Sequence, residues 1–209
     1  LDLVEPTDLA RGRAPAVIGM PFGCGKLARA EDLRLFGPSG DPAPPQAEVF
    51  SRWPDGSVKF ATLAFFAETR AGERRGYRLE ARPDWPHAGI GPMTARVEEG
   101  DGRWRVRGKG LHFDLGRKVP ALFENVAFDR DGDGEIGAGE RISAAPRLAN
   151  LRLEMADGAN LTCGAPERFD VESNGAVRAV LRWSGPLVDD AGRPGWAYVI
   201  RATLFAGLP

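Results

Sequence analysis

The sequence predicts an all-β protein, because it consists of short alternating runs separated by turn signals, with little helical periodicity. Residues 151–155 and 177–183 alternate between apolar and other side chains, as strands with one buried face do. Residues 58–66 are apolar on both faces, which is typical of a strand at the centre of a sheet. Asn174-Gly175 and the Trp-Pro-Asp-Gly run at 53–56 predict tight turns. Strands joined by such turns indicate a sandwich or a barrel.

Length and charge exclude several functions. The 209 residues are 43% hydrophobic, enough for one large β domain or two smaller ones. The charges of the 28 basic and 29 acidic residues nearly cancel, so the chain lacks the excess of positive charge that is typical of nucleic-acid-binding proteins. No apolar run approaches the roughly 20 residues of a membrane helix. We therefore predict neither a nucleic-acid partner nor membrane insertion.

The ends and the middle of the sequence suggest how the chain is organised. It opens at Leu1 without a signal peptide, and we interpret it as a processed or trimmed chain. The acidic, Gly-containing turn at 98–102 predicts a domain boundary, with one domain at 1–99 and a second at 100–209. An apolar, strand-like run lies just before Pro209, so we expect the second domain, or the parent protein, to continue beyond it.

The two cysteines leave two alternatives open. Cys24 and Cys163 are far apart in sequence, and in an oxidising compartment they could form one disulfide that stabilises the fold by roughly 3 to 5 kcal/mol. The alternative is two unpaired thiols. The cysteine count therefore does not determine the compartment.

Residues 129–140 fit the loop of an EF-hand calcium site. Asp129, Asp131 and Asp133 occupy loop positions 1, 3 and 5, so three carboxylates can converge on one hard cation. Glu135 at position 7 offers its backbone carbonyl, and Glu140 at position 12 can bind through both oxygens. Ligation by oxygen alone selects Ca²⁺ over softer metals. These five residues are the predicted metal ligands.

Other positions of this loop agree with the same interpretation. Gly134 at position 6 permits the sharp turn, water completes the vertex at Gly137, and Ile136 anchors the loop. The alternative is a solvated acidic turn. Because the sequence offers one such loop, we expect a structural site and not a sensor. Extracellular sites of this kind bind calcium at about 10⁻⁴ to 10⁻³ M, which favours a secreted, periplasmic or cell-surface protein.

Other signals point less clearly to a site. Residues 19–26 depart from the spacing of a phosphate-binding loop and have Leu27 where Ser or Thr should stand. Of the two histidines, we expect His112 to be partly exposed on a strand, and His87 lies in a turn-like stretch. Neither has a zinc-ligand or nucleophile pattern around it. We therefore predict no catalytic residue in this chain.

Two sets of side chains could contact a glycan. Arg103, Arg105 and Arg107 alternate along one strand face and could bind an anionic glycan, although an ordinary solvated face is the simpler interpretation. Tryptophans near turns could stack on sugar rings, but they more often close the ends of a core. These tryptophans are Trp53, Trp85 and Trp196.

Several stretches resemble one known family. Residues 17–22, 33–36 and 46–59, the last with the run Arg-Trp-Pro-Asp-Gly-Ser-Val, resemble the N-terminal barrel of exo-rhamnogalacturonan lyase-like proteins. Residues 171–181 and 198–207 resemble the start of that family's central β-sandwich. The resemblance implies a small swirled β-barrel, called a RIFT barrel, followed by a β-sandwich. The calcium loop falls within the expected sandwich, but its prediction depends on its own residues and not on the resemblance. The resemblance also implies a C-terminal helical toroid with the lyase active site, which has no counterpart in this sequence.

Three functions follow as hypotheses. The first is the noncatalytic β-domain portion of a secreted polysaccharide lyase-like protein acting on acidic, pectin-type glycans, stabilised by Ca²⁺. Its partners would be an acidic polysaccharide and the missing toroid or other protein modules. The second is a cell-surface or appendage module that binds glycan or protein without enzymatic activity. The third, a self-contained enzyme, is disfavoured because the chain shows no acid–base or nucleophile signature.

Overall fold

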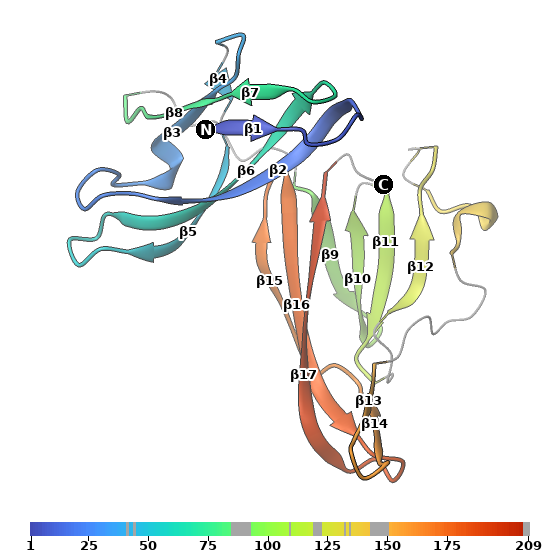
Figure 1. Cartoon of the computed structure of the whole chain (residues 1–209). Helices are drawn as coiled ribbons and strands as arrows, with labels where there is room; N and C mark the ends of the chain where they lie inside the picture. The colour runs from blue at the N-terminus through green and yellow to red at the C-terminus, as the bar shows by residue number, and fades with distance from the viewer. Residues whose placement is uncertain are drawn as a thin grey trace. The chain divides into compact units, whose positions relative to one another are not determined.

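The computed structural model describes residues 1–40, 42–43, 45–84, 93–108, 110–118, 123–131, 133, 135–142 and 151–206, which form mainly strands and turns (Figure 1). The helical elements among them are two short 3-10 turns, η1 (Ala30–Asp32) and η2 (Ala138–Glu140). Neither has the length or the apolar character that a helix needs to cross a membrane. The all-β prediction is confirmed.

The chain divides into two compact units. The first comprises Leu1–Pro92 with Gly175–Val177, and the second comprises Met93–Asn174 with Arg178–Pro209. The second unit begins before residue 99, because β9 (Ala95–Gly100) pairs with β10 (Arg103–Gly108) across the turn at Asp101 and Gly102. The boundary predicted after residue 99 therefore lies at the end of a strand of the second unit.

The N-terminal unit is built from short antiparallel sheets. The longest strand, β6, lies between β2 and β5, and the other sheets have the orders β4-β3-β8 and β1-β7. Val58, Ala61 and Leu63 of β6 are fully buried, so the prediction of a central strand at 58–66 is confirmed. The strands are β1 (Asp2–Val4), β2 (Arg11–Pro21), β3 (Leu33–Phe36), β4 (Pro42–Ala43), β5 (Gln46–Arg52), β6 (Val58–Thr69), β7 (Arg74–Gly76) and β8 (Arg78–Ala81).

The turn between β5 and β6 follows the chemistry of its residues. Gly56 has φ of 84° and donates its N–H to the Trp53 carbonyl at 2.9 Å. Asp55 Oδ1 accepts hydrogen bonds from both the backbone N–H and the hydroxyl of Ser57, at 2.9 and 2.6 Å. The predicted turn at 53–56 is therefore confirmed.

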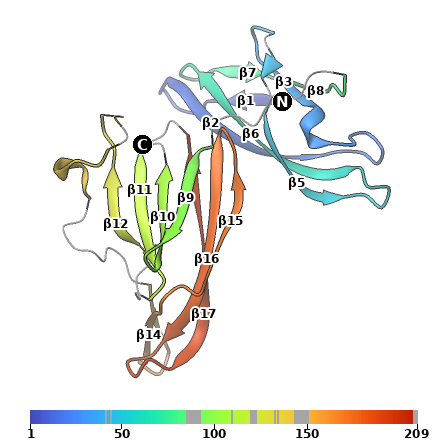
Figure 2. The ribbon, with the colours of Figure 1, turned by 180° about the vertical axis from the view of Figure 1, so that it is seen from behind.

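The C-terminal unit has two antiparallel sheets. One has the order β12-β11-β10-β9, and the other has the order β13-β14-β16-β15 with β17 also paired to β16. The views in Figure 1 and Figure 2 show β16 and β17 extending to the β13–β14 hairpin at their far end. The remaining strands are β11 (Leu111–Gly116), β12 (Glu124–Phe128), β13 (Arg152–Glu154), β14 (Asn160–Cys163), β15 (Arg168–Asn174), β16 (Arg178–Val188) and β17 (Pro194–Phe205).

Both sheets contribute to a single core, which makes the unit a β-sandwich. Ala179, Leu181 and Trp183 alternate along β16 and are fully buried, as the periodicity of 177–183 predicts. The Trp183 ring lies against Phe123, with ring centroids 5.5 Å apart. Trp104 of β10 stacks on Phe169 of β15 with centroids 5.3 Å apart. Burial of such large aromatic rings contributes to the stability of this core.

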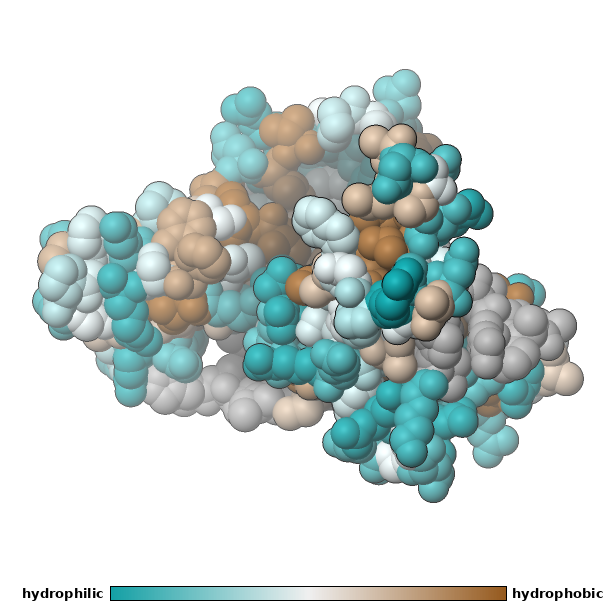
Figure 3. Space-filling model, turned by 90° about the horizontal axis from the view of Figure 1, so that it is seen from below, coloured by the Kyte–Doolittle hydropathy of each residue, from teal (hydrophilic) through white to brown (hydrophobic). Residues whose placement is uncertain are grey.

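One strand differs from its expected environment. The run at 151–155 predicts a half-buried strand, but β13 is exposed along its length and Leu153 is 38% exposed. The reason is that β13 lies at the edge of its sheet, beyond β14. Figure 3, a view of the molecule from below, shows apolar side chains (brown) among hydrophilic ones (teal) on the surface.

Candidate functional site

The predicted calcium loop is an excursion between two antiparallel chain segments. It leaves the end of β12 at Asp129, whose N–H donates to the Gly110 carbonyl at 2.8 Å. It returns through η2 to Arg141, which forms a β-bridge with Ala127. The Ile142 N–H then donates to the Val126 carbonyl at 3.0 Å. The β12 strand and this bridge therefore hold the two ends of the loop together.

The three predicted aspartate ligands come together. Carboxylate oxygens of Asp129, Asp131 and Asp133 lie within 4.8 Å of one another. Hydrogen bonds within the loop orient two of them, because Asp131 Oδ1 accepts from Asp133 N at 3.2 Å and Asp133 Oδ1 accepts from Glu135 N at 2.7 Å. Oxygen atoms at such separations suit a hard cation such as Ca²⁺.

Glu140 closes the loop through the backbone. Its Oε1 accepts from Arg130 N at 2.7 Å and its Oε2 accepts from Gly137 N at 2.8 Å. These two bonds lower the pKa of Glu140, because they stabilise its ionised form. Both oxygens are thus directed into the loop from position 12. The predicted turn residue Gly134 lies outside the described residues.

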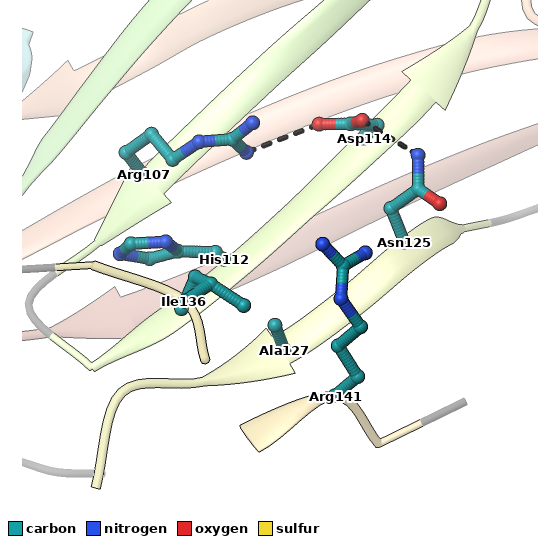
Figure 4. A pocket seen from close by; sticks show the side chains of 7 residues that line it. All are labelled: Arg107, His112, Asp114, Asn125, Ala127, Ile136 and Arg141. Atoms are coloured by element: carbon teal, nitrogen blue, oxygen red, sulfur yellow. Dashed lines mark hydrogen bonds and ion pairs between the residues drawn. The ribbon is translucent and has the colours of Figure 1, made fainter. Parts of the chain in front are cut away.

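Beside the loop is a polar pocket of about 270 Å³. Its floor is the sheet of β10, β11 and β12, and Ile136 of the loop closes one side, so the predicted anchor residue is part of the pocket wall. Figure 4 shows the lining side chains converging from these elements. They are Arg107, His112, Asp114, Asn125, Ala127, Ile136 and Arg141.

Asp114 organises this pocket. It is 5% exposed, and its Oδ1 accepts from Arg107 Nη1 at 3.0 Å while its Oδ2 accepts from Asn125 Nδ2 at 2.9 Å. Arg103 Nη1 approaches the same carboxylate at 3.5 Å. Asn125 has φ of 49°, a left-handed conformation at the irregularity in the β11–β12 pairing. A buried carboxylate therefore receives two guanidinium groups and one amide.

His112 is buried at 8% exposure, and the prediction of a partly exposed histidine is wrong. Its strand β11 lies between β10 and β12. Ile136 of the loop lines the same pocket as His112, so the face of β11 that carries His112 is not fully exposed to solvent. Burial lowers the pKa of His112, and the nearby positive charge of Arg107 lowers it further. The neutral imidazole is therefore favoured.

The arginine face predicted on β10 is paired. Arg103 and Arg107 bond to Asp114, and Arg105 bonds to Asp101. The three guanidinium groups thus take part in ion pairs within their own sheet and its turns.

The predicted tryptophans differ in their surroundings. Trp53 Nε1 donates to the Phe22 carbonyl at 2.9 Å, and Lys59 Nζ lies 4.6 Å from the centre of its ring. Trp53 also lines a shallow apolar pocket of about 340 Å³ with Phe50, which is 82% exposed, and Phe60. Trp196 is 62% exposed on β17. Trp85 and His87 lie outside the described residues.

Both cysteines are free thiols in the structure. Cys24 is exposed in the N-terminal unit and Cys163 is buried in the C-terminal unit. The Cys24 Sγ donates to Asp55 Oδ2 at 3.1 Å, and this bond raises the pKa of the thiol. Burial raises the pKa of Cys163. Neither environment favours the thiolate.

The fold and the comparisons together define the protein class. The described strands form short antiparallel sheets in the N-terminal unit and a β-sandwich in the C-terminal unit. Residues 7–82 match the family model of the PcRGLX-like N-terminal RIFT barrel domain. The match supports a RIFT barrel over residues 7–82, so the resemblance noted in the sequence is confirmed for the N-terminal barrel. A search among curated proteins found no match.

Proposed function

We propose that this chain is a noncatalytic β-domain portion of a secreted rhamnogalacturonan lyase-like protein that acts on acidic, pectin-type glycans. The observation that carries the proposal is the match of residues 7–82 to the N-terminal barrel of that family. The barrel and the sandwich would support and orient a catalytic part of the parent protein. Secretion is proposed on the same ground, because members of an extracellular polysaccharide-degrading family meet their substrate outside the cell.

Calcium is proposed as a structural ion of the sandwich. Three aspartate carboxylates meet in the loop at 129–140, and Glu140 faces the same loop from its last position. Their mutual repulsion favours binding of a cation, and an ion bound only by the folded loop stabilises the fold. The loop connects β12 to the β-bridge at Arg141, so the ion would hold an edge of the sandwich in place.

The chemistry of the titratable groups supports a role without catalysis. A lyase acting on a uronate needs a base for the C5 proton and a group that neutralises the neighbouring carboxylate. His112 is buried beside Arg107, and the pKa of the exposed Cys24 is raised. Neither group is placed as an activated base or nucleophile.

Incubation of this chain with rhamnogalacturonan tests the proposal. Lyase products are unsaturated, so turnover would appear as rising ultraviolet absorbance. We expect no rise from this chain and a rise from the full-length parent. Absorbance that rises with the chain alone would contradict the noncatalytic role.

The apolar pocket around Phe50 favours a second candidate, an extracellular or cell-surface module that binds glycan or protein. Phe50 and Phe60 pack edge to face with centroids 6.3 Å apart, beside Trp53. Such exposed aromatic faces are typical of binding sites. In this case Phe50→Ala should abolish retention on immobilised pectin. Leu9→Ala, which removes another exposed apolar side chain of the same unit, should leave retention unchanged.

A further inference from the structure

We propose that the pocket lined by Arg107, Asn125 and Arg141 binds a carboxylate group of a small ligand. This goes beyond the supporting role proposed above, because it gives the sandwich a binding site of its own. The pocket lies in the C-terminal unit, outside the residues that match the barrel family.

Arg141 provides the main argument. Within the described part of the chain, no acidic side chain pairs with its guanidinium and no carbonyl accepts from it. Figure 4 shows this group directed along the pocket toward Asn125 and Asp114. A guanidinium presents its N–H donors in a planar fork that matches a carboxylate. An exposed arginine that lines a pocket without an ion-pair partner is therefore a candidate receptor for an anion.

Arg107 adds a second donor on the opposite side. Its Nη1 makes the bond to Asp114 at 3.0 Å and also donates to the Val106 and Phe113 carbonyls. In the described residues its Nη2 has no acceptor, although its side chain is 35% exposed. Arg107 is thus fixed in place by Asp114 and keeps one N–H₂ group available to a ligand.

The charge balance of the pocket favours an anion. Among its lining side chains, the guanidinium groups of Arg107 and Arg141 face the single carboxylate of Asp114. Arg103 adds a third guanidinium to that carboxylate, at 3.5 Å. The buried His112 favours its neutral form, so its ring nitrogens contribute no fixed charge. Among the described side chains that line the pocket, positive charge therefore exceeds negative charge.

Size and polarity indicate the kind of molecule. A volume of about 270 Å³ lies below the range of roughly 300–1,000 Å³ typical of drug-sized ligands, so the pocket suits a single small acid. The Asn125 amide and the His112 ring offer further hydrogen bonds for hydroxyl groups. A sugar acid combines both features. The choice of a sugar acid as the ligand rests on the proposed function. The preference for a carboxylate rests on the pocket residues alone.

The loop carboxylates oppose anion binding. Asp129 and Glu140 act electrostatically on His112 from the adjoining loop. The pocket is thus least favourable to an anion when the loop holds no cation. A titration without calcium is therefore the stricter condition, and its outcome does not depend on whether the loop binds calcium.

The test is a titration of chelator-stripped ¹⁵N-labelled protein in calcium-free buffer, followed by amide chemical shifts. The probes are sodium galacturonate, sodium acetate and, as a neutral match to the first, galactose. We expect saturable shifts at β10, β12 and Arg141 with both carboxylates and none with galactose. Arg141→Gln, at an exposed position, should weaken binding at least about tenfold, since a charge-assisted bond is lost. Arg96→Gln removes an exposed guanidinium elsewhere in the unit and should not change binding.

The other outcomes of the titration separate the pocket proposal from the proposed function. No saturable shift with either carboxylate, an equal response to galactose, or equal binding by Arg141→Gln and Arg96→Gln overturns the pocket proposal. Binding of acetate without galacturonate keeps the carboxylate site and removes its support for an acidic glycan. The proposed supporting function is tested separately by the lyase assay.

Discussion

Loss of the aspartate charges from the loop at 129–140 should abolish stabilisation by calcium. The sharpest perturbation is the double variant Asp131→Asn with Asp133→Asn. Asparagine retains a side-chain oxygen that can accept the loop hydrogen bonds from Asp133 N and Glu135 N. The change therefore removes two negative charges from the cluster and leaves the turn geometry in place.

The expected size follows from binding linkage. With a dissociation constant of about 10⁻⁴ to 10⁻³ M, 10 mM calcium stabilises the folded state by roughly 1.4 to 2.7 kcal/mol. For a chain of this length each kcal/mol corresponds to about 2–4 °C, so the melting temperature should rise by roughly 3 to 11 °C. In chelator the variant should melt at or slightly above the parent, because repulsion among the three carboxylates is relieved.

Differential scanning calorimetry in chelator, 10 mM calcium and 10 mM magnesium measures these shifts. The matched control is Asp157→Asn, because Asp157 makes the same type of turn hydrogen bond, to Ala159 N at 3.0 Å, in the β13–β14 hairpin. The control should respond to calcium as the parent does. An unchanged melting temperature of the parent in calcium, or an equal rise in the double variant, would refute the reasoning.

Three further predictions concern the sandwich. Leu181→Ala should cost about 2–5 kcal/mol in urea unfolding, since Leu181 is fully buried. A cost below 1 kcal/mol would contradict this core. The lowered pKa of His112 means that the unfolded chain binds the proton more tightly. Stability should therefore fall as pH drops from about 6.5 through the folded-state pKa, and His112→Gln should flatten this dependence. An unchanged pH dependence of stability in His112→Gln would contradict a lowered pKa of His112. Asn125→Ala should destabilise more than Asn125→Gly, because φ of 49° strains alanine. Equal thermal stability would contradict the strain.

The sequence predicted those parts of the fold that depend on local periodicity. The alternation at 177–183 places Ala179, Leu181 and Trp183 in the core, and the apolar run at 58–66 becomes the central strand β6. The exposed β13 was missed because alternation indicates a strand but not whether another layer covers it.

For the candidate site, spacing alone predicted that the three loop aspartates would meet, since alternate residues of a tight loop face its centre. The neighbouring pocket could not be predicted. Asp114, Asn125 and Arg141 lie on different strands or at a bridge, so only the pairing of β11 with β12 and of Ala127 with Arg141 brings them together. His112 and Ile136 likewise line one pocket although many residues separate them in the sequence.

Direct titration of chelator-stripped protein with calcium in a calorimeter tests the central claim about the loop most directly. The account predicts one ion per chain, a dissociation constant of about 10⁻⁴ to 10⁻³ M, and loss of this binding in the Asp131→Asn, Asp133→Asn variant. Absence of binding by the parent, or equal binding by parent and variant, would contradict a calcium site at residues 129–140.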